Sequence, residues 1–175
     1  SKVVLLLSYI TIASISAAII TPALPLITQS FNIEHGALEW VISIYLLGYV
    51  FGQLIYGPLA NKFGRLWALR CGLLVNLVGI LLCLGSIYSL NYPLLLTGRL
   101  ITALGAASGL TCTLMLLNEL LPEEQTMRAM SFTIVAFTLG IGAAVIVGGI
   151  IAEYFFWGDC FWVLLIHGLF MLFLT

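Results

Sequence analysis

The sequence predicts an all-α membrane protein, a bundle of six transmembrane helices, from its composition and from the spacing of its apolar runs. Hydrophobic residues make up 62% of the 175-residue chain and charged residues 7%, whereas soluble domains carry about a quarter charged residues. Six apolar runs follow one another along the chain, and about 20 consecutive apolar residues cross a bilayer as a helix. The 17 glycines fit such a bundle, because small residues let helices approach closely in lipid.

The first helix is expected at residues 3–27. Its apolar run is too long for the core of a signal peptide and lacks a charged-then-cleaved layout, so we expect a retained spanning helix. The run closes with the sequence Thr21-Pro22-Ala23-Leu24-Pro25. Because proline interrupts the hydrogen bonds of a helix, Ser14, Ser16 and Thr21 are candidates to face a central cavity at this opening.

The second helix is expected at residues 38–60 and the third at residues 66–88. Gly48 and Gly52 form a small-xxx-small pair on the second helix, a pattern that is typical of ordinary helix packing. Gln53 is the polar exception on that helix. It either lines a cavity or bonds a neighbouring helix, and the sequence does not separate the two interpretations.

The fourth helix is expected at residues 92–118, and it carries Arg99 inside its apolar run. A charge at the bilayer centre costs about 2.5–3.5 kcal/mol on insertion scales, and less nearer the interface. Arg99 either serves packing, by snorkelling outwards or by tying carbonyls of adjacent helices together, or it faces the cavity as a functional cation. We favour the second interpretation.

The fifth helix is expected at residues 129–152 and the sixth at residues 159–175. On the fifth helix, Gly140, Ala144 and Gly148 share one small face that permits tight packing, and Gly149 follows them. The sixth run spans roughly 25 Å at 1.5 Å per residue, slightly less than the hydrocarbon core of a bilayer. We therefore expect either a thin span or a chain that was cut near its end.

The charges in the loops predict the orientation of the bundle. With the N-terminus in the cytoplasm, the outer loops contain acidic residues and His35 but no lysine or arginine. The inner loops then receive Lys2, Lys62, Arg65, Arg70 and Arg128. Because cytoplasmic loops carry an excess of Lys and Arg, we expect both termini in the cytoplasm and a multi-pass location in the plasma membrane.

Several classes of function are excluded by the composition and the motifs. Six basic residues and a net charge of −1 provide no electrostatic footprint for nucleic acid. The four cysteines form no C-x-x-C pair, so we expect neither a metal site nor a disulfide. The sequence contains no H-E-x-x-H, no G-x-S-x-G, no phosphate loop and no paired carboxylates within the spans, so we expect neither an enzyme nor a cofactor.

The loop between the second and third helices reads Gly57-Pro58-Leu59-Ala60-Asn61-Lys62-Phe63-Gly64-Arg65. It resembles the signature of the major facilitator superfamily, G-x-L-a-D-r-x-G-r. Gly57 is expected to allow close approach of two helices, and Gly64 to permit a tight turn. In the family, the acidic position of this loop contacts the other half of the transporter. Asn61 occupies that position here, which retains polarity but removes the charge.

Three further segments are similar to the same superfamily. Residues 45–56, YLLGYVFGQLIY, resemble the second helix of the drug-efflux branch related to bicyclomycin and chloramphenicol exporters. Residues 99–107 are similar to the pattern R-x-x-x-G-x-g-a-a, in which the arginine takes part in proton coupling or substrate contact. Residues 140–149 resemble the antiporter motif G-x-x-x-G-P-x-x-G-G, with Ala144 and Val145 in place of its Gly-Pro.

Glu119 falls where the family places an acidic residue at the inner end of the fourth helix. It either pairs with Arg65 or Arg70 across the inner surface, or it is a solvated charge that contributes at most about 1 kcal/mol. The resemblance therefore implies a conformational-switch region formed by Gly57, Asn61, Gly64, Arg65, Arg70 and Glu119.

The resemblance implies that the chain is the N-terminal half of a transporter and that a C-terminal six-helix half is missing from it. Members of the family carry small molecules by alternating access around a site between two bundles. The efflux-like second helix favours export, with a proton as the coupling ion. No carboxylate lies deep in any span, so a coupling acid must lie elsewhere. An uptake carrier of the same superfamily and a non-transporting membrane scaffold are the alternatives.

Overall fold

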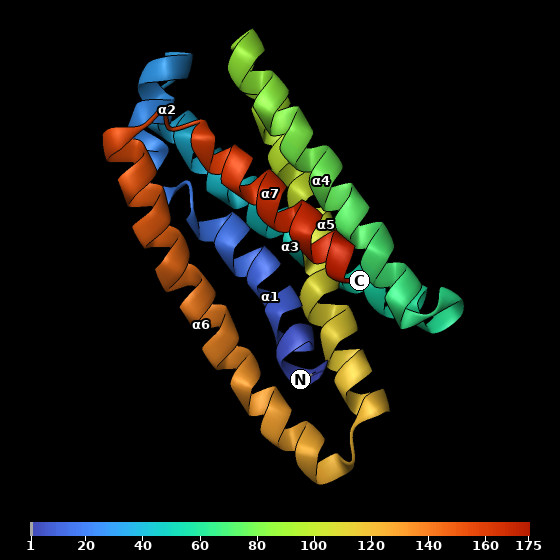
Figure 1. Cartoon of the computed structure of the whole chain (residues 1–175). Coiled ribbons are helices and arrows are strands. Elements are labelled where there is room, and N and C mark those ends of the chain that lie inside the picture. The colour runs from blue at the N-terminus through green and yellow to red at the C-terminus, as the bar shows by residue number, and fades with distance from the viewer. Residues whose placement is uncertain (1) are drawn as a thin grey trace.

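The computed structural model describes residues 2–175, which are helical almost throughout and contain no strand (Figure 1). Its elements are α1 (Lys2–Ala18), the 3-10 turn η1 (Thr21–Ala23), α2 (Leu24–Phe31), α3 (His35–Phe63), α4 (Arg65–Ser89), α5 (Tyr92–Leu120), α6 (Glu123–Tyr154) and α7 (Asp159–Leu174). Residues Lys2–Phe31 together make one span, and α3, α4, α5 and α6 are also long and apolar enough to cross a membrane. The all-α fold class predicted from the composition is confirmed.

The helices lie over the expected apolar runs but differ from them at their ends. α6 begins at Glu123, next to Pro122, and so includes charged residues that precede the expected start at residue 129. The first span is interrupted between α1 and α2, where Pro22 and Pro25 begin two short helical pieces. α7 has 16 residues and is shorter than α3, α4, α5 and α6.

The close contact between α4 and α5 is made by glycines that face each other. A Cβ atom on Gly79 would meet the backbone of Thr102, and a Cβ atom on Gly105 would meet the backbone of Asn76. On the other side of α5, Gly48 of α3 lies against the Leu100 carbonyl, so that a Cβ atom there would lie 2.7 Å from its oxygen. These small residues let the two backbones approach, and α5 becomes the centre of the bundle.

α6 lies along α1, as Figure 1 shows. Gly140, Ala144 and Gly148 are all buried on one side of α6, and Gly148 lies directly against the Ile19 carbonyl. The small face expected from the sequence is therefore the face that packs on α1. Gly149 is not part of this contact, because a Cβ atom added to it would meet nothing within 4 Å.

At one end of the bundle, the junction between α6 and α7 is tied to the first span. The Trp157 indole Nε1 donates a hydrogen bond to the Ser30 hydroxyl of α2 at 2.8 Å. The Trp157 ring also packs against Phe31, with ring centroids 6.0 Å apart. A buried indole needs a hydrogen-bond acceptor, and here the acceptor comes from a segment far away in the sequence.

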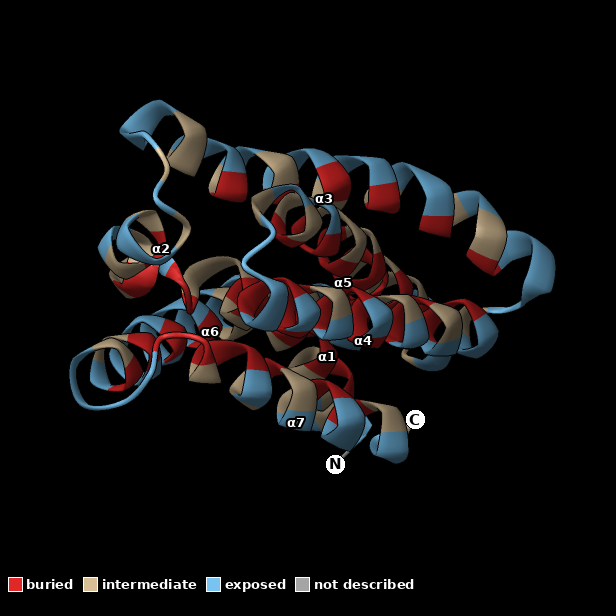
Figure 2. Ribbon diagram, turned by 90° about the horizontal axis from the view of Figure 1, so that it is seen from above, coloured by how far each residue is buried: buried red, intermediate tan, exposed pale blue. Residues whose placement is uncertain are grey.

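The outer faces of α3 and α6 are the least covered parts of the bundle. Both helices bury a much smaller share of their residues than α4 or α5. Figure 2 shows the exposed residues of α3 on the side that faces away from α5. Their apolar side chains suit contact with lipid or with further protein.

Candidate functional site

Arg99 lies in the interior of the bundle, on the central helix α5. Only 1% of the residue is exposed. Its Nη1 donates a hydrogen bond to the Ser16 carbonyl of α1 at 2.9 Å, and its guanidinium carbon lies 4.3 Å from the centre of the Tyr45 ring of α3. Three helices therefore converge on one cation.

Tyr45 is itself held in place by α1. Its hydroxyl donates to the Ala13 carbonyl at 3.1 Å, which fixes the ring beneath the guanidinium. A cation over an aromatic face is attracted by the ring quadrupole, by about 2 kcal/mol when the pair is desolvated. Tyr45 lies on the same side of α3 as Gly48 and Gly52, which pack on α5, and this explains how its ring reaches Arg99.

The polar groups around Arg99 retain unused hydrogen-bonding capacity. Nε and Nη2 of Arg99 and the hydroxyl of Ser16 are buried, and none of the three has a hydrogen-bond partner among residues 2–175. No acidic side chain from this range pairs with the guanidinium. Because an unpaired buried donor is costly, these groups have hydrogen-bonding capacity that the described bundle does not satisfy.

Both interpretations of Arg99 describe part of what the structure contains. The side chain ties to a carbonyl of an adjacent helix, as the packing interpretation requires. It does not snorkel to the surface, because it is almost completely buried. The two free nitrogens are the feature that packing alone does not explain.

The other cavity candidates do not gather around Arg99. Ser14 is fully buried and packs against Gly140 in the contact between α1 and α6, while Thr21 is exposed at η1. Gln53 is partly buried on α3 and lies beside Tyr49. None of the three forms a hydrogen bond with Arg99.

The loop between α3 and α4 is a single residue, Gly64, whose φ is 100°. This conformation is one that residues with a side chain rarely adopt, so the tight turn expected at Gly64 is present. The close approach expected at Gly57 is not made within the described bundle. Among residues 2–175, a Cβ atom on Gly57 would meet nothing within 4 Å, because no second helix of the described bundle lies against that point of α3.

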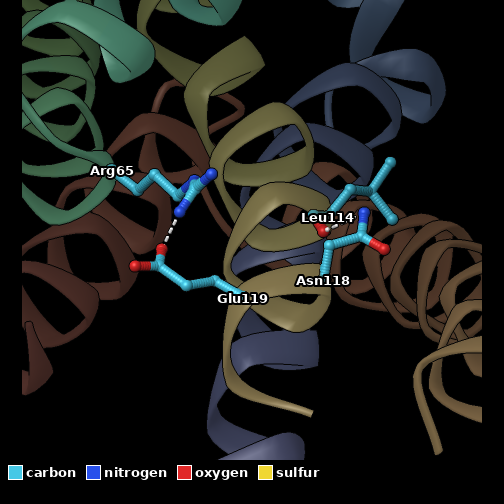
Figure 3. Close-up of polar contacts among 4 residues, drawn as sticks. All are labelled: Arg65, Leu114, Asn118 and Glu119. Carbon is cyan, nitrogen blue, oxygen red and sulfur yellow. Dashed lines mark hydrogen bonds and ion pairs between the residues drawn. The ribbon is translucent and has the colours of Figure 1, made fainter. Parts of the chain in front are cut away.

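Arg65 forms an ion pair with Glu119 at the end of α5 (Figure 3). Glu119 therefore pairs with Arg65 rather than with Arg70, whose Nη2 instead donates to the Thr175 carbonyl at 2.9 Å. Next to the ion pair, the Asn118 amide donates to the Leu114 carbonyl within α5 at 3.1 Å (Figure 3). Asn61 is exposed on the last turns of α3.

Tyr45 is the site residue that the sequence did not single out. Its spacing from Gly48 and Gly52 places it on the packing face of α3, since residues three and seven apart share one side of a helix. That spacing is a signal that the ring points towards α5. The spacing does not predict which residue lies above the Tyr45 ring, because that depends on how the helices pack.

Comparison with known proteins identifies the family of the chain. It matches the model of the Major Facilitator Superfamily over residues 6–175. It is 35% identical over 133 residues to the 4-hydroxybenzoate transporter PcaK of Pseudomonas aeruginosa. The aligned segment covers 76% of this chain and 29% of that protein. It is 32% identical over 151 residues to the quinolone resistance protein NorB of Staphylococcus aureus, with 86% and 32% covered.

A third relative is the riboflavin transporter RibZ of Clostridioides difficile, which is 26% identical over 149 residues, with 85% of this chain and 32% of that protein covered. The chain thus spans about a third of the length of the curated relatives that it matches.

Proposed function

The chain belongs to the major facilitator superfamily, and on this premise we propose that it forms one bundle of a proton-coupled exporter of small organic molecules. The family identifies it as a transporter rather than an enzyme, and as a multi-pass protein of the plasma membrane. Direction, substrate, coupling ion and the second bundle are the parts that we propose. The transport cycle would be alternating access, in which two bundles rock around a site between them.

The buried guanidinium of Arg99 is the observation that best supports a transport role. A cation inside an apolar bundle is costly, and Arg99 has no carboxylate among residues 2–175 to offset that cost. Its free Nε and Nη2 can donate to a carboxylate or carbonyl of the substrate, or to a group of the second bundle. We propose that Arg99 binds such an acceptor in one state of the cycle and releases it in the other.

The proton-coupling acid is proposed to lie in the second bundle. The spans of this chain contain no deep carboxylate, whereas intramembrane acids are the usual proton carriers in transporters. A protonation event there would change the charge that faces Arg99. In this proposal, the described bundle contributes the cation and the second bundle contributes the acid that is protonated.

Transport by the full-length protein in proteoliposomes with an imposed pH gradient tests the proposal. A quinolone, 4-hydroxybenzoate and riboflavin are the first substrates to try, because relatives carry these names. Arg99→Ala is expected to lower the flux by at least about tenfold, since a hydrogen bond to a charged group contributes about 1.5–3 kcal/mol. Arg128→Ala is the matched control, because this arginine is exposed near the start of α6 and belongs neither to the Arg99 site nor to the loop between α3 and α4.

Normal flux in Arg99→Ala protein that is inserted and folded would refute the role of Arg99. Flux that is indifferent to the pH gradient would refute proton coupling. The 175-residue chain alone is expected to show no flux in sealed vesicles, because the site is proposed to need both bundles. Robust flux by that chain would contradict the need for a second bundle.

An uptake carrier is the second candidate, and the similarity to a transporter named for 4-hydroxybenzoate favours it. The same vesicles separate the two directions. An exporter accumulates substrate in inverted vesicles with an acidic interior, whereas an uptake carrier that moves with protons accumulates it in right-side-out vesicles with an acidic exterior. A scaffold accumulates substrate in neither.

A further inference from the structure

The first span changes its backbone geometry between α1 and α2 (Figure 1). α1 ends at Ala18, and its last helical hydrogen bond runs from the Ile19 N–H to the Ile15 carbonyl at 3.0 Å. The three residues of η1 then form a 3-10 turn before α2 begins. A short stretch of 3-10 helix inside a longer helix often marks a hinge.

The break leaves the Ser16 carbonyl without a partner from its own helix. In a continuous α-helix, this carbonyl would accept a hydrogen bond from the N–H of Ile20, four residues later. Among residues 2–175, the Ile20 N–H forms no such bond. The Ser16 carbonyl instead accepts a hydrogen bond from Nη1 of Arg99 at 2.9 Å. A side chain of α5 therefore replaces a backbone donor of the first span.

A second carbonyl at the break is also held by other helices. The Ile19 carbonyl lies 3.8 Å from the sulfur of Cys160 on α7, which is a weak donor, and directly against Gly148 of α6. The far end of α2 is fixed by the hydrogen bond from Trp157 to Ser30. The broken form of the first span is thus maintained by groups from other parts of the bundle.

The backbone at the break is already close to α-helical geometry. Ile20 has φ −84° and ψ −10°, and Ala23 has φ −88° and ψ −6°, whereas an α-helix has ψ of about −42°. Both residues lie in the sparsely populated bridge region next to the right-handed helix. Pro22 opposes closure, because it has no N–H for the Ala18 carbonyl and its ring crowds that carbonyl in a helix. The segment is therefore near a second conformation but is held away from it.

Closure of the break would turn α2 relative to α1. A 3-10 helix turns by about 120° per residue and an α-helix by about 100°. Conversion of the three residues of η1 would therefore rotate α2 by roughly 60° about its axis. Because Ser30 and Phe31 contact Trp157 in the broken form, this rotation would pull both residues away from the indole. A change at Ser16 would thus be felt at the far end of α2.

We infer that the Ser16 carbonyl switches between two donors, the guanidinium of Arg99 and the N–H of Ile20. While Arg99 holds the carbonyl, the first span stays broken. When the guanidinium is drawn to another acceptor, the Ile20 N–H takes its place, α1 extends, and α2 turns. The inference rests on the proposed function, in which Arg99 binds an acceptor in one state of the cycle and releases it in the other.

The distance between two spin labels on the full-length protein in nanodiscs tests this switch. One label is attached at Gln29→Cys, which is exposed on α2, and the other at Ser89→Cys, at the exposed end of α4. Cys71 and any reactive cysteine in the rest of the protein are replaced by serine. The most populated distance between the labels then reports how α2 lies relative to α4.

Two variants are expected to close the break by different routes. Arg99→Met removes the donor that competes with Ile20, while an apolar side chain of similar length fills the buried space. Pro22→Ala removes the ring and supplies an N–H for the Ala18 carbonyl. Both variants are expected to shift the label distance in the same direction by roughly 2–5 Å, because a 60° turn moves a side chain on a helix surface by about 5 Å.

Pro93→Ala is the matched control. Pro93 is exposed in the first turn of α5, where proline fits because its missing N–H would have no helical partner. The same replacement is therefore expected to leave the label distance unchanged. Pro22→Ala leaves the Arg99 side chain in place, so it remains decisive if Arg99→Met protein fails to fold.

An unchanged distance in either folded variant would overturn the inference, because the break would then not depend on the competing donors. Shifts in opposite directions, or an equal shift in Pro93→Ala, would overturn it as well. Flux through the same protein in proteoliposomes separates the switch from the proposed function. The expected shifts without any flux would refute transport and leave the hinge, whereas flux without any shift would refute the hinge alone.

Discussion

At the scale of single residues, the hydrogen-bonding groups of Arg99 are only partly satisfied. The guanidinium has five N–H donors, and the described bundle supplies one carbonyl and one aromatic ring. These contacts fix the position of the cation without neutralising it. A residue placed in this way can respond to an incoming negative charge without first breaking an ion pair.

The ring of Tyr45 is predicted to stabilise the bundle more than its hydroxyl does. Tyr45→Phe removes the hydrogen bond to the Ala13 carbonyl, and it should lower the free energy of unfolding by about 1 kcal/mol. Tyr45→Leu also removes the aromatic face beneath Arg99, and it should cost about 2 kcal/mol more. Equilibrium unfolding of the purified chain in mixed detergent measures both, and equal losses would contradict the stacking role.

The ion pair between Arg65 and Glu119 is predicted to contribute little. The two side chains are 31% and 52% exposed, so solvent and salt screen their attraction. A double-mutant cycle with Arg65→Gln and Glu119→Gln should give a coupling energy below about 1 kcal/mol that shrinks as salt is added. A coupling energy of several kcal/mol that is insensitive to salt would contradict this prediction.

At the scale of helices, the bundle contains a tight pair and looser edges. α4 and α5 are held together by glycines that leave no space for a side chain, such as Gly79 and Gly105. α6 touches the bundle mainly through the small residues that face α1. The two kinds of contact predict different tolerance of substitution along the chain.

Adjacent glycines on α6 provide a direct test of this difference. Gly148→Ala would push a Cβ atom into the Ile19 carbonyl, and the resulting strain should cost about 1–3 kcal/mol of stability. Gly149→Ala meets open space and should stabilise the helix by about 0.4–1 kcal/mol, because alanine is the better helix former. Thermal unfolding in detergent compares them, and equal shifts would show that the α1–α6 contact is wrong.

Helices and small faces could be predicted from the sequence because hydropathy and spacing are local properties. The small face of α6 is an example, because the four-residue spacing of Gly140, Ala144 and Gly148 places them on one side of the helix. The close approach expected at Gly57 is not made among residues 2–175, because a small residue shows that a backbone can approach but not that a neighbour is present. The sequence also placed the start of α6 too late, because hydropathy marks contact with lipid and not the first helical turn.

The candidate site was predictable only in part for the same reason. Arg99 stands out as a charge within an apolar run. Its neighbours Ser16 and Tyr45 come from other helices, and so they follow from packing rather than from any local pattern. The buried Thr133 hydroxyl, which has no hydrogen-bond partner among residues 2–175, is likewise a property of the assembled bundle.

At the scale of the whole molecule, the charges of the loops predict the orientation of the bundle in the membrane. Asn61, on the last turns of α3, and Glu153, on the last turn of α6, are both exposed. The two positions are expected to lie on opposite sides of the membrane. In a Cys71→Ser background, Asn61→Cys should react with an impermeant maleimide only in inverted vesicles. Glu153→Cys should react only in intact cells, because positive loops stay in the cytoplasm. The reverse pattern would invert the topology.

The hydrogen bond between Trp157 and Ser30 joins groups that lie 127 residues apart in the chain. At about 5–20 residues per second of synthesis, the first span emerges roughly 6–25 s before the residue that fastens its end. During this interval its serines and small side chains face lipid or the insertion machinery instead of α6 and α7. The first span therefore stays without this hydrogen bond until Trp157 has been synthesised. Slowing translation after α5 would lengthen this delay, and with it the time during which proteases can cleave the first span.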